Sequence, residues 1–375
     1  GSHLGRWSAA SDVYKRQRLV TLLTAFADPV TPVYRYETGF LLMEGRIADR
    51  EGYSEIRLSR NELLFGFYAL TPVEGAVVSS IDGDGQEVVW ELVEDSNRYR
   101  APEGWTAEAG KSYHIRAVTP QGEAVESAPE LMPASVAIQE VRVVFEQEAY
   151  FSTGRDRFVP AFRMLLDLED PSDEENYYQF GFTAWETIEV CASCERARWR
   201  NGECIASPDT RFVARWDYLC DMECWVSAQS GRRNSLSDAF INGNRVANIE
   251  VGRFDFARTG GLLFVLEQFN ITQPSFKFSE VLEGISEGSG GLNAPLPAAL
   301  VGNLTDLSDN RTNVLGYVGV AAVNVERIYI DRDTVNGTPL SSNASIILEP
   351  ADPSPPRAPC VGGVRTTERP AGWPN

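Results

Sequence analysis

Apolar and polar residues alternate in short runs along most of the chain after residue 38, and turn residues separate these runs. Residues 112–118 (SYHIRAV) alternate in this way, and the turn sequence at 82–85 (DGDG) precedes a strand-like run at 87–92. Alternation with a period of two is typical of strands that bury one face. Asp-Gly accepts the positive φ angles of tight hairpin turns. Residues 38–133 are therefore predicted to form a β-sandwich of the immunoglobulin-like or transthyretin-like type.

Strand-like runs continue in residues 136–335, which are predicted to form a second β-rich domain. One segment departs from this pattern: residues 278–285 (FSEVLEGI) fit a short helix, with Ser279 as its N-cap and glycines near its end. The proline-rich tail at 336–375 is predicted to be extended. The pattern thus indicates a mainly β protein, with an N-terminal sandwich, then a second β-rich domain that carries one short helix and a cysteine-rich insert.

The N-terminus contains two segments that are set apart from the fold. Residues 1–17 match the translation of a sequencing adapter or a tag remnant, and they are excluded from fold reasoning. Residues 18–27 join an arginine to a short apolar run and to Ala-Phe-Ala, the small-x-small pattern of a signal-peptidase site. We interpret them as a truncated export signal, followed by a linker at 28–37. Phe26 stands where a lipoprotein signal requires cysteine.

Composition argues against two classes of function. The formal net charge of −19 disfavours nucleic-acid binding through phosphate neutralisation. Histidine, the usual general base near neutral pH, occurs only at His3 and His114. The chain has no glycine-rich phosphate loop, nucleophile elbow or HExxH motif. We therefore expect a binding protein and no enzymatic activity.

Cysteines are concentrated in the insert at 191–224, which holds five of the six. The disulfide candidates are Cys191, Cys194, Cys204, Cys220, Cys224 and Cys360. An even number of cysteines in an exported chain favours disulfides. The alternative is a four-thiolate zinc site, because C-x2-C and C-x3-C pairs are close to a zinc-ribbon pattern; its ligands would be Cys191, Cys194, Cys220 and Cys224. A thioredoxin-like redox role lacks the βαβ context that it needs.

An acidic run lies between two apolar strand candidates. Its members are Asp167, Glu169, Asp170, Asp173, Glu174 and Glu175. Carboxylates of this kind can bind calcium or act as paired acids in glycoside hydrolysis. We favour a solvated hairpin tip, because Pro171 and Ser172 at its centre are turn residues. No cofactor is expected, with zinc and calcium as the alternatives.

Aromatic residues and arginines are interleaved around the cysteines. The tryptophans are Trp185, Trp199, Trp216 and Trp225, and the arginines include Arg198 and Arg215. Both residue types are enriched at interface hot spots, which would suit a peptide or glycan ligand. Alternatively, the tryptophans pack against disulfides in a small subcore. The sequence leaves both interpretations open.

Short segments in a fixed order along nearly the whole chain carry a family resemblance. They lie at 28–30, 42–47, 56–59, 72–78, 99–102, 110–113, 175–178, 224–227, 301–304, 314–318 and 360–363. In this order they resemble a group of Bacteroidota envelope lipoproteins, domain-of-unknown-function family 4249. The chain departs from that group at Phe26, in place of the lipidated cysteine, and in a longer insert at 191–220.

The resemblance implies an exported protein at the outer-membrane surface or in the periplasm. It implies an accessory or ligand-binding subunit that associates with a TonB-dependent outer-membrane receptor in nutrient uptake, and it transfers no catalytic residues. Two other hypotheses remain. One is a cell-surface hydrolase that uses Asp167, Glu169 or nearby acids, and the other is a structural, adhesin-like module.

Overall fold

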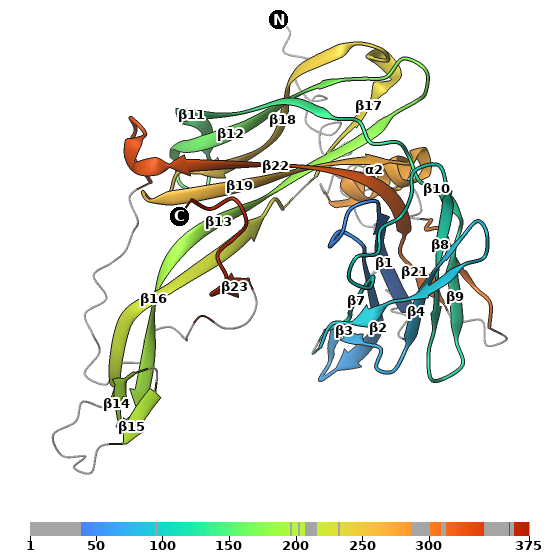
Figure 1. Ribbon diagram of the computed structural model, residues 1–375, viewed down its shortest axis with the longest axis horizontal. Helices are drawn as coiled ribbons and strands as arrows, with labels where there is room; N and C mark the ends of the chain where they lie inside the picture. The colour runs from blue at the N-terminus through green and yellow to red at the C-terminus, as the bar shows by residue number, and fades with distance from the viewer. Residues whose placement is uncertain are drawn as a thin grey trace, which may run out of the picture. The chain divides into compact units, whose positions relative to one another are not determined.

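The computed structural model of the chain describes residues 39–94, 96–195, 197–201, 203–206, 216–231, 233–286, 301–308, 313–340, 360 and 364–374. Within these ranges, the side chains at 68, 189–195, 198–200, 216–222 and 286 lie outside the description. The described residues form four sheets and one α-helix (Figure 1). The mainly β class that the sequence predicts is confirmed.

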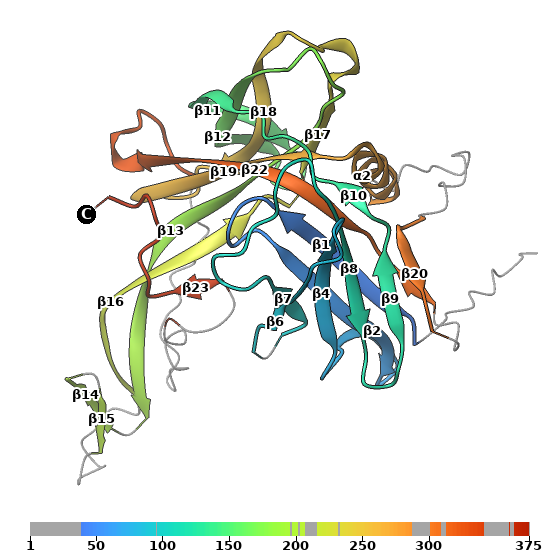
Figure 2. The same cartoon turned by 45° about the vertical axis from the view of Figure 1, so that its right-hand side comes forward.

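A six-stranded sheet forms one layer of the N-terminal sandwich (Figure 2). In spatial order its strands are β20 (Leu304–Asp306), β9 (Ala124–Ser127), β8 (Ser112–Val118), β4 (Val77–Asp82) and β5 (Glu87–Val89), and β10 (Glu130–Leu131) also pairs with β8. The alternation in β8 buries Tyr113, Ile115 and Ala117 on one face. These side chains share a core with Met43 and Ile56 from the facing strands.

A twelve-stranded sheet supplies the facing layer and continues beyond it. Its main path runs β23 (Arg365–Thr366), β16 (Trp216–Gln229), β13 (Tyr177–Glu195), β19 (Gly261–Ile271), β22 (Val318–Asp331), β1 (Leu41–Ala48), β2 (Glu55–Leu64), β7 (Arg98–Arg100) and β6 (Glu91–Leu92). Three further strands pair with members of this path: β3 (Phe67–Pro72) with β2, β17 (Asn234–Ser237) with β13 and β21 (Val314–Leu315) with β1.

Strand β22 joins the early and late parts of the chain. Its first residues pair in parallel with β1, from Gly45↔Val318 to Ala48↔Ala321, and the rest pairs antiparallel with β19. Together with β20 and β21, it adds strands from beyond residue 300 to the sandwich built by the first third of the chain. The domain boundaries expected from the sequence, 38–133 and 136–335, place these late strands outside the sandwich. Local alternation of apolar and polar residues carries no information about which distant strands pair.

A second core lies between the twelve-stranded sheet and a three-stranded sheet. The latter contains β11 (Ile138–Ser152), β12 (Arg157–Glu169) and β18 (Arg245–Asp255), in that order. Phe162 from β12 and Phe264 from β19 are fully buried there, with ring centroids 6.4 Å apart. A two-stranded sheet, β14 (Ala197–Arg200) with β15 (Glu203–Ala206), and the short 3-10 helices Asp238–Phe240 and Arg332–Thr334 complete the described elements.

The helix, α2, spans Gln273–Ser286 and begins five residues before the predicted start. The prediction that Ser279 caps it is wrong, because Ser279 lies inside the helix and its Oγ donates to Ser275 O. Thr272 takes the capping position, and its Oγ1 accepts from Ser275 N at 3.3 Å. No helix in the described part of the chain has the length and apolarity needed to cross a bilayer.

Candidate functional site

An arginine-lined cleft of about 510 Å³ opens on the twelve-stranded sheet, at the meeting of β1, β2, β7, β16 and β19. Its cationic side chains are Arg46, Arg57, Arg98, Arg100 and Arg233. Its carboxylates are Glu44, Glu55 and Glu267. Five arginines against three glutamates make the lining cationic, in a chain whose formal net charge is −19.

Strand alternation explains how β1 presents charge to this cleft. Met43 and Ile47 point into the sandwich core, whereas Glu44 and Arg46 occupy the other face. Gly45 lies between them with a φ of +148°, and a Cβ at this position would lie 2.1 Å from Glu55 O. Only glycine therefore allows β2 to approach β1 this closely beside the cleft.

Two of the arginines share one aromatic ring at the floor of the cleft. The guanidinium carbons of Arg46 and Arg233 each lie 4.2 Å from the centroid of Phe269, which is buried. The ring faces attract these cations, and the attraction is stronger where water is displaced. Tyr53 packs edge-on against the same ring, with centroids 6.3 Å apart.

The arginine pair is short of negative partners. Burial, and secondly the charge of Arg233, lower the pKa of Arg46 to about 9. Burial also lowers the pKa of Arg233, against the opposing effect of Glu267, whose Oε2 lies 3.9 Å from Arg233 Nη2. Arg233 Nη1 is buried without a hydrogen-bond partner. The Arg46 guanidinium likewise forms no hydrogen bond or ion pair with the residues that the structure describes.

Tyr53 adds a neutral hydrogen-bonding group to the cleft. Burial, followed by the charge of Glu267, raises the pKa of Tyr53 to about 12. Its hydroxyl therefore stays protonated at neutral pH and can donate a hydrogen bond.

Three arginines also converge on one carboxylate of the cleft, Glu55, which is the cross-strand partner of Arg46. Glu55 lies within 3.3 Å of Arg100 Nε, 3.4 Å of Arg57 Nε and 3.6 Å of Arg98 Nη1. These pairs are partly exposed and contribute little stability each. Because one carboxylate faces three cations, donors remain for an incoming anion.

Two smaller cavities adjoin the cleft through shared residues. One, of about 400 Å³, shares Glu44, Arg57 and Arg98, and the other, of about 150 Å³, shares Gly45 and Arg46 and extends to α2. The two smaller cavities thus lie next to the cleft along β1 and β2.

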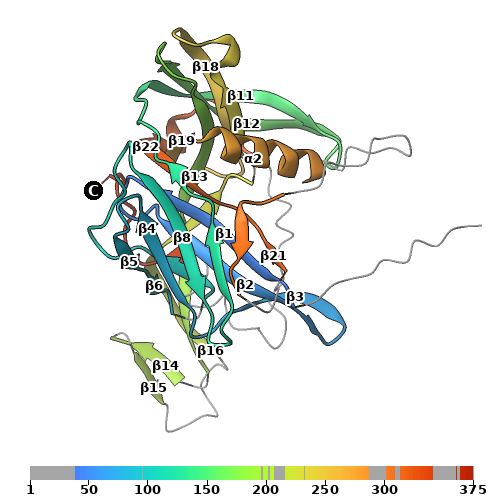
Figure 3. The same cartoon turned by 90° about the vertical axis from the view of Figure 1, so that its right-hand side faces the viewer.

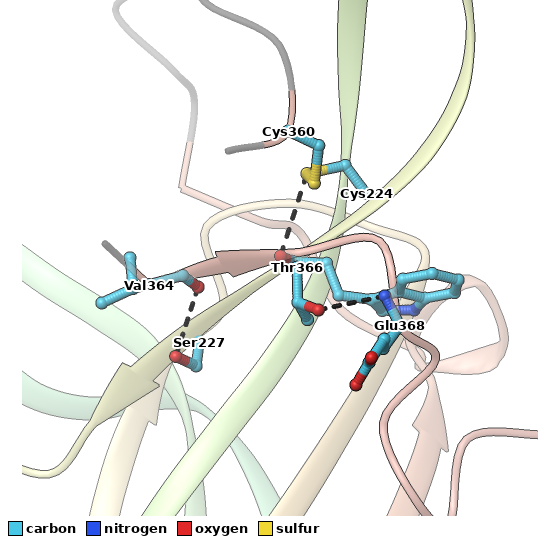
Figure 4. Close-up of a disulfide and its surroundings, with 7 residues drawn as sticks. Cys224, Ser227, Cys360, Val364, Thr366 and Glu368 are labelled. Carbon is cyan, nitrogen blue, oxygen red and sulfur yellow. Dashed lines mark hydrogen bonds between the residues drawn. A yellow bond between two sulfur atoms is a disulfide. The ribbon is translucent and has the colours of Figure 1, made fainter. Parts of the chain in front are cut away.

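The cysteine prediction has a definite outcome at one pair. Cys224 on β16 and Cys360 form a buried disulfide, 136 residues apart in sequence (Figure 4). Ser227 Oγ also donates to Val364 O, which holds the following segment on the same strand (Figure 4). Cys204 is disulfide-bonded as well. The side chains of Cys191, Cys194 and Cys220 lie outside the description.

The pairing corrects the predicted zinc ligand set. Cys224 is one of its four sulfurs, and a sulfur in a disulfide has no thiolate to offer a metal. Its partner lies in the C-terminal tail, far from the spacing pattern that suggested zinc. A four-thiolate zinc site that includes Cys224 therefore cannot form while this disulfide is present.

Two members of the acidic run are buried, so the expectation of a solvated hairpin tip is wrong for them. Asp167 accepts from Arg142 Nη2 at 2.7 Å, Arg245 Nη2 at 3.0 Å and Asn248 N at 2.8 Å. The Asn248 amide, together with the arginines, lowers the pKa of Asp167.

Asp170 accepts from the Tyr178 hydroxyl and from Gly243 N. Residues 172–175 form the exposed turn that the sequence predicts. Neither Asp167 nor Glu169 lines the arginine cleft.

The predicted aromatic platform is only partly within the description. Trp225 is buried and packs edge-on against Trp373, with centroids 6.2 Å apart, and Trp185 is half-buried on β13. The side chains of Trp199, Trp216 and Arg198, and all of Arg215, lie outside the described part of the chain. Trp225 is thus buried within the fold, whereas packing of the tryptophans against disulfides stays a prediction.

Fold and cleft together define a β-rich protein with a basic, ligand-sized cleft on one sheet. Residues 27–327 match the family described as Domain of unknown function (DUF4249), and the chain belongs to this family. No curated protein matches the chain.

Proposed function

We propose that the protein binds an anionic ligand in the arginine-lined cleft and acts without catalysis. The observation that carries this proposal is the pair Arg46 and Arg233, stacked on Phe269 with an unpartnered, buried Nη1. Two like charges that are partly removed from water are costly unless an anion joins them. A ligand carboxylate would supply the missing acceptor and the missing charge, in the bidentate geometry that guanidinium groups favour.

The ligand class follows from the volume and charge of the cleft. Its volume of about 510 Å³ falls in the range of small-molecule sites. The cleft presents several guanidinium groups on adjoining strands: two lie over Phe269, and three others surround Glu55, the cross-strand partner of Arg46. We therefore propose a ligand with more than one carboxylate, either an acidic peptide or a uronate-containing glycan.

Titration calorimetry with short oligoglutamate and oligogalacturonate tests this proposal, with oligoglutamine and a neutral glycan of equal length as controls. Saturable binding of an acidic probe is expected, and Arg46→Met and Arg233→Met should each abolish it. Arg155→Met is a matched control, because Arg155 is exposed and does not line the cleft. Equal binding of acidic and neutral probes, or unchanged affinity in both cleft variants, would refute the assignment.

We further propose a cellular setting for this binding. The protein belongs to the envelope of a member of the Bacteroidota, at the outer-membrane surface or in the periplasm, where it serves a TonB-dependent nutrient-uptake receptor as an accessory subunit. The support is the order of family-like segments along the chain. Co-purification of such a receptor from native membranes is the expected result, and its repeated absence would count against the partnership.

A further inference from the structure

The hairpin formed by β2 and β3 carries the most exposed aromatic side chains of the N-terminal sandwich. Phe65 is 99% exposed and Phe67 is 77% exposed, and Leu63, Leu64 and Leu70 beside them are also exposed. Figure 3 shows this hairpin projecting past the neighbouring strands. From Leu63 to Thr71 the sequence LLFGFYALT contains no charged residue. An apolar cluster of this kind is unusual on a surface that faces only water.

The turn at the tip is built at a conformational cost. Phe65 has a φ of 51° and Gly66 a φ of 84°, so both central residues lie in the left-handed region. Two-residue hairpin turns with two positive φ angles favour Asn-Gly, because asparagine tolerates this region and a bulky aromatic residue does not. Packing inside the chain does not offset this conformational cost, because the Phe65 side chain is almost fully exposed. The benefit of phenylalanine must therefore come from something outside the chain.

Both faces of the hairpin are apolar. The register pairs Leu64 with Phe67, and it places Leu63 and Leu70 on the opposite face. A folded protein partner would cover one face of such a ribbon and leave the other in water. A lipid layer surrounds an inserted tip from all sides, and so it accounts for both faces at once.

From these observations we propose that the β2–β3 hairpin inserts its tip into the surface of a lipid bilayer. Glu62, which pairs with Ala69, is the charged residue nearest the tip, so two residues on each strand and the turn extend beyond it, a depth of about 10 Å at roughly 3.3 Å per residue. This matches the interfacial depth of shallowly inserted apolar segments. Within the described residues β3 pairs only with β2, so its outer edge keeps unpaired backbone groups that oppose deeper insertion.

Charged residues at the base of the hairpin limit the insertion: Glu62 is the nearest to the tip, and Arg60 lies two residue pairs further from it. Arg60 forms an ion pair with Glu123 and donates to Gly39 O at 3.0 Å, which fixes polar groups at the level where the strands leave the sandwich. The tip itself has no lysine or arginine, and the chain is strongly acidic. Insertion should therefore depend on apolar area and should not be strengthened by anionic lipids.

Flotation of the full chain with phosphatidylcholine vesicles tests the proposal. The chain is expected to float with neutral vesicles, and Phe65→Asn combined with Phe67→Thr should lower the partition coefficient by about tenfold or more. Phe65→Asn alone should raise the Tm, because it restores the Asn-Gly turn, and should weaken flotation. Phe240→Ser is the matched control: Phe240 is also 99% exposed but is not part of the hairpin. It should float like the unmodified chain.

Three outcomes would overturn the proposal: no flotation with neutral vesicles, flotation that requires phosphatidylglycerol, or equal loss in the Phe240 control. The hairpin variants should retain binding of the acidic probes. A failure at the cleft and a failure at the hairpin are thus distinguishable.

Discussion

Arg46 and Arg233 lie over the same ring, each with its guanidinium carbon 4.2 Å from the centroid of Phe269, although 187 positions separate them in sequence. Strand β1 supplies one of them, and the segment between β16 and β17 supplies the other. Burial, and secondly the charge of Arg233, lower the pKa of Arg46 to about 9. The ligand-free protein therefore keeps this pair at a cost in stability.

Replacing Arg46 with methionine should expose that cost. Methionine retains the unbranched stem and can still contact Phe269, so the variant should gain about 1 kcal/mol of unfolding free energy, as in other trade-offs between stability and function. The same variant should lose the rise in Tm that an acidic ligand produces. Thermal melts with and without oligoglutamate measure both effects. A less stable variant that still binds would contradict the assignment of Arg46.

Another arginine, Arg332, is buried with a counter-charge and three carbonyl acceptors around it. Arg332 donates to Glu186 Oε1 at 2.5 Å and to the carbonyls of Thr259, Gly260 and Gly261. Glu186→Gln should lower the free energy of unfolding by about 3–5 kcal/mol, because it leaves a buried guanidinium without its counter-charge.

Arg258 provides the control for this prediction. It pairs with the same carboxylate at 2.9 Å but is largely exposed. Arg258→Gln should therefore cost about 1 kcal/mol or less. Urea denaturation compares the two variants, and similar losses in both would contradict the importance of burial at Arg332.

The disulfide between Cys224 and Cys360 closes a loop of more than a hundred residues. In the chain-entropy view, a disulfide that closes a loop of this length stabilises the fold because it lowers the conformational entropy of the unfolded chain. Removing a native disulfide costs about 2–5 kcal/mol of unfolding free energy. Replacing both cysteines with alanine should lower the Tm accordingly, and a reductant should then have a smaller effect on the variant than on the unmodified chain. Intact mass after alkylation, with and without reductant, verifies the pairing. Equal stability of the two chains would show that strand pairing alone holds this segment.

Sequence reasoning recovers the strands better than it recovers the cleft. Alternation identifies β8 and the turn at 82–85 because each signal is local. The cleft depends on Arg46, Arg233 and Phe269, which long-range pairing brings together and no motif marks. A weak signal exists in the outward positions of β1 and β2, where Glu44, Arg46, Glu55 and Arg57 alternate with core residues. Alone, that pattern is also expected of any solvated face.

The acidic run at 167–175 also shows that sequence reasoning misses contacts between distant strands. Six acids between two strands suggest a solvated turn, and this is correct for the residues that stay near the turn. Asp167 differs because Arg142 and Arg245 reach it from neighbouring strands of the three-stranded sheet. Whether a carboxylate is exposed or buried therefore depends on strand order, which the sequence does not display.

Two carboxylates should respond to pH in opposite directions. Burial raises the pKa of Glu130, and hydrogen bonds from Tyr317 and Thr272 only partly oppose this effect. At Glu186 burial also acts to raise the pKa, but Arg258 and Arg332 outweigh it and lower the pKa below 4.5. Glu186 thus stabilises the fold above pH 4.5 and loses this contribution as the pH falls through its folded-state pKa. Ionisation of Glu130 destabilises the fold at neutral pH, and this penalty disappears as the pH falls from its raised pKa towards 4.5.

Unfolding free energies of the unmodified chain, Glu130→Gln and Glu186→Gln, measured between pH 7 and about pH 3, separate the two effects. The difference between the unmodified chain and Glu186→Gln should shrink below pH 4.5, because protonation removes the charge that the variant lacks. The unmodified chain should instead gain stability relative to Glu130→Gln as the pH falls, and this change should begin above pH 4.5. Glu130 lies where β10, α2 and β22 meet, and it accepts from Thr272 Oγ1 at 2.7 Å and from Val320 N at 3.4 Å. Parallel pH profiles for the two variants would show that the Glu130 carboxyl is not held in the desolvated state that its contacts indicate.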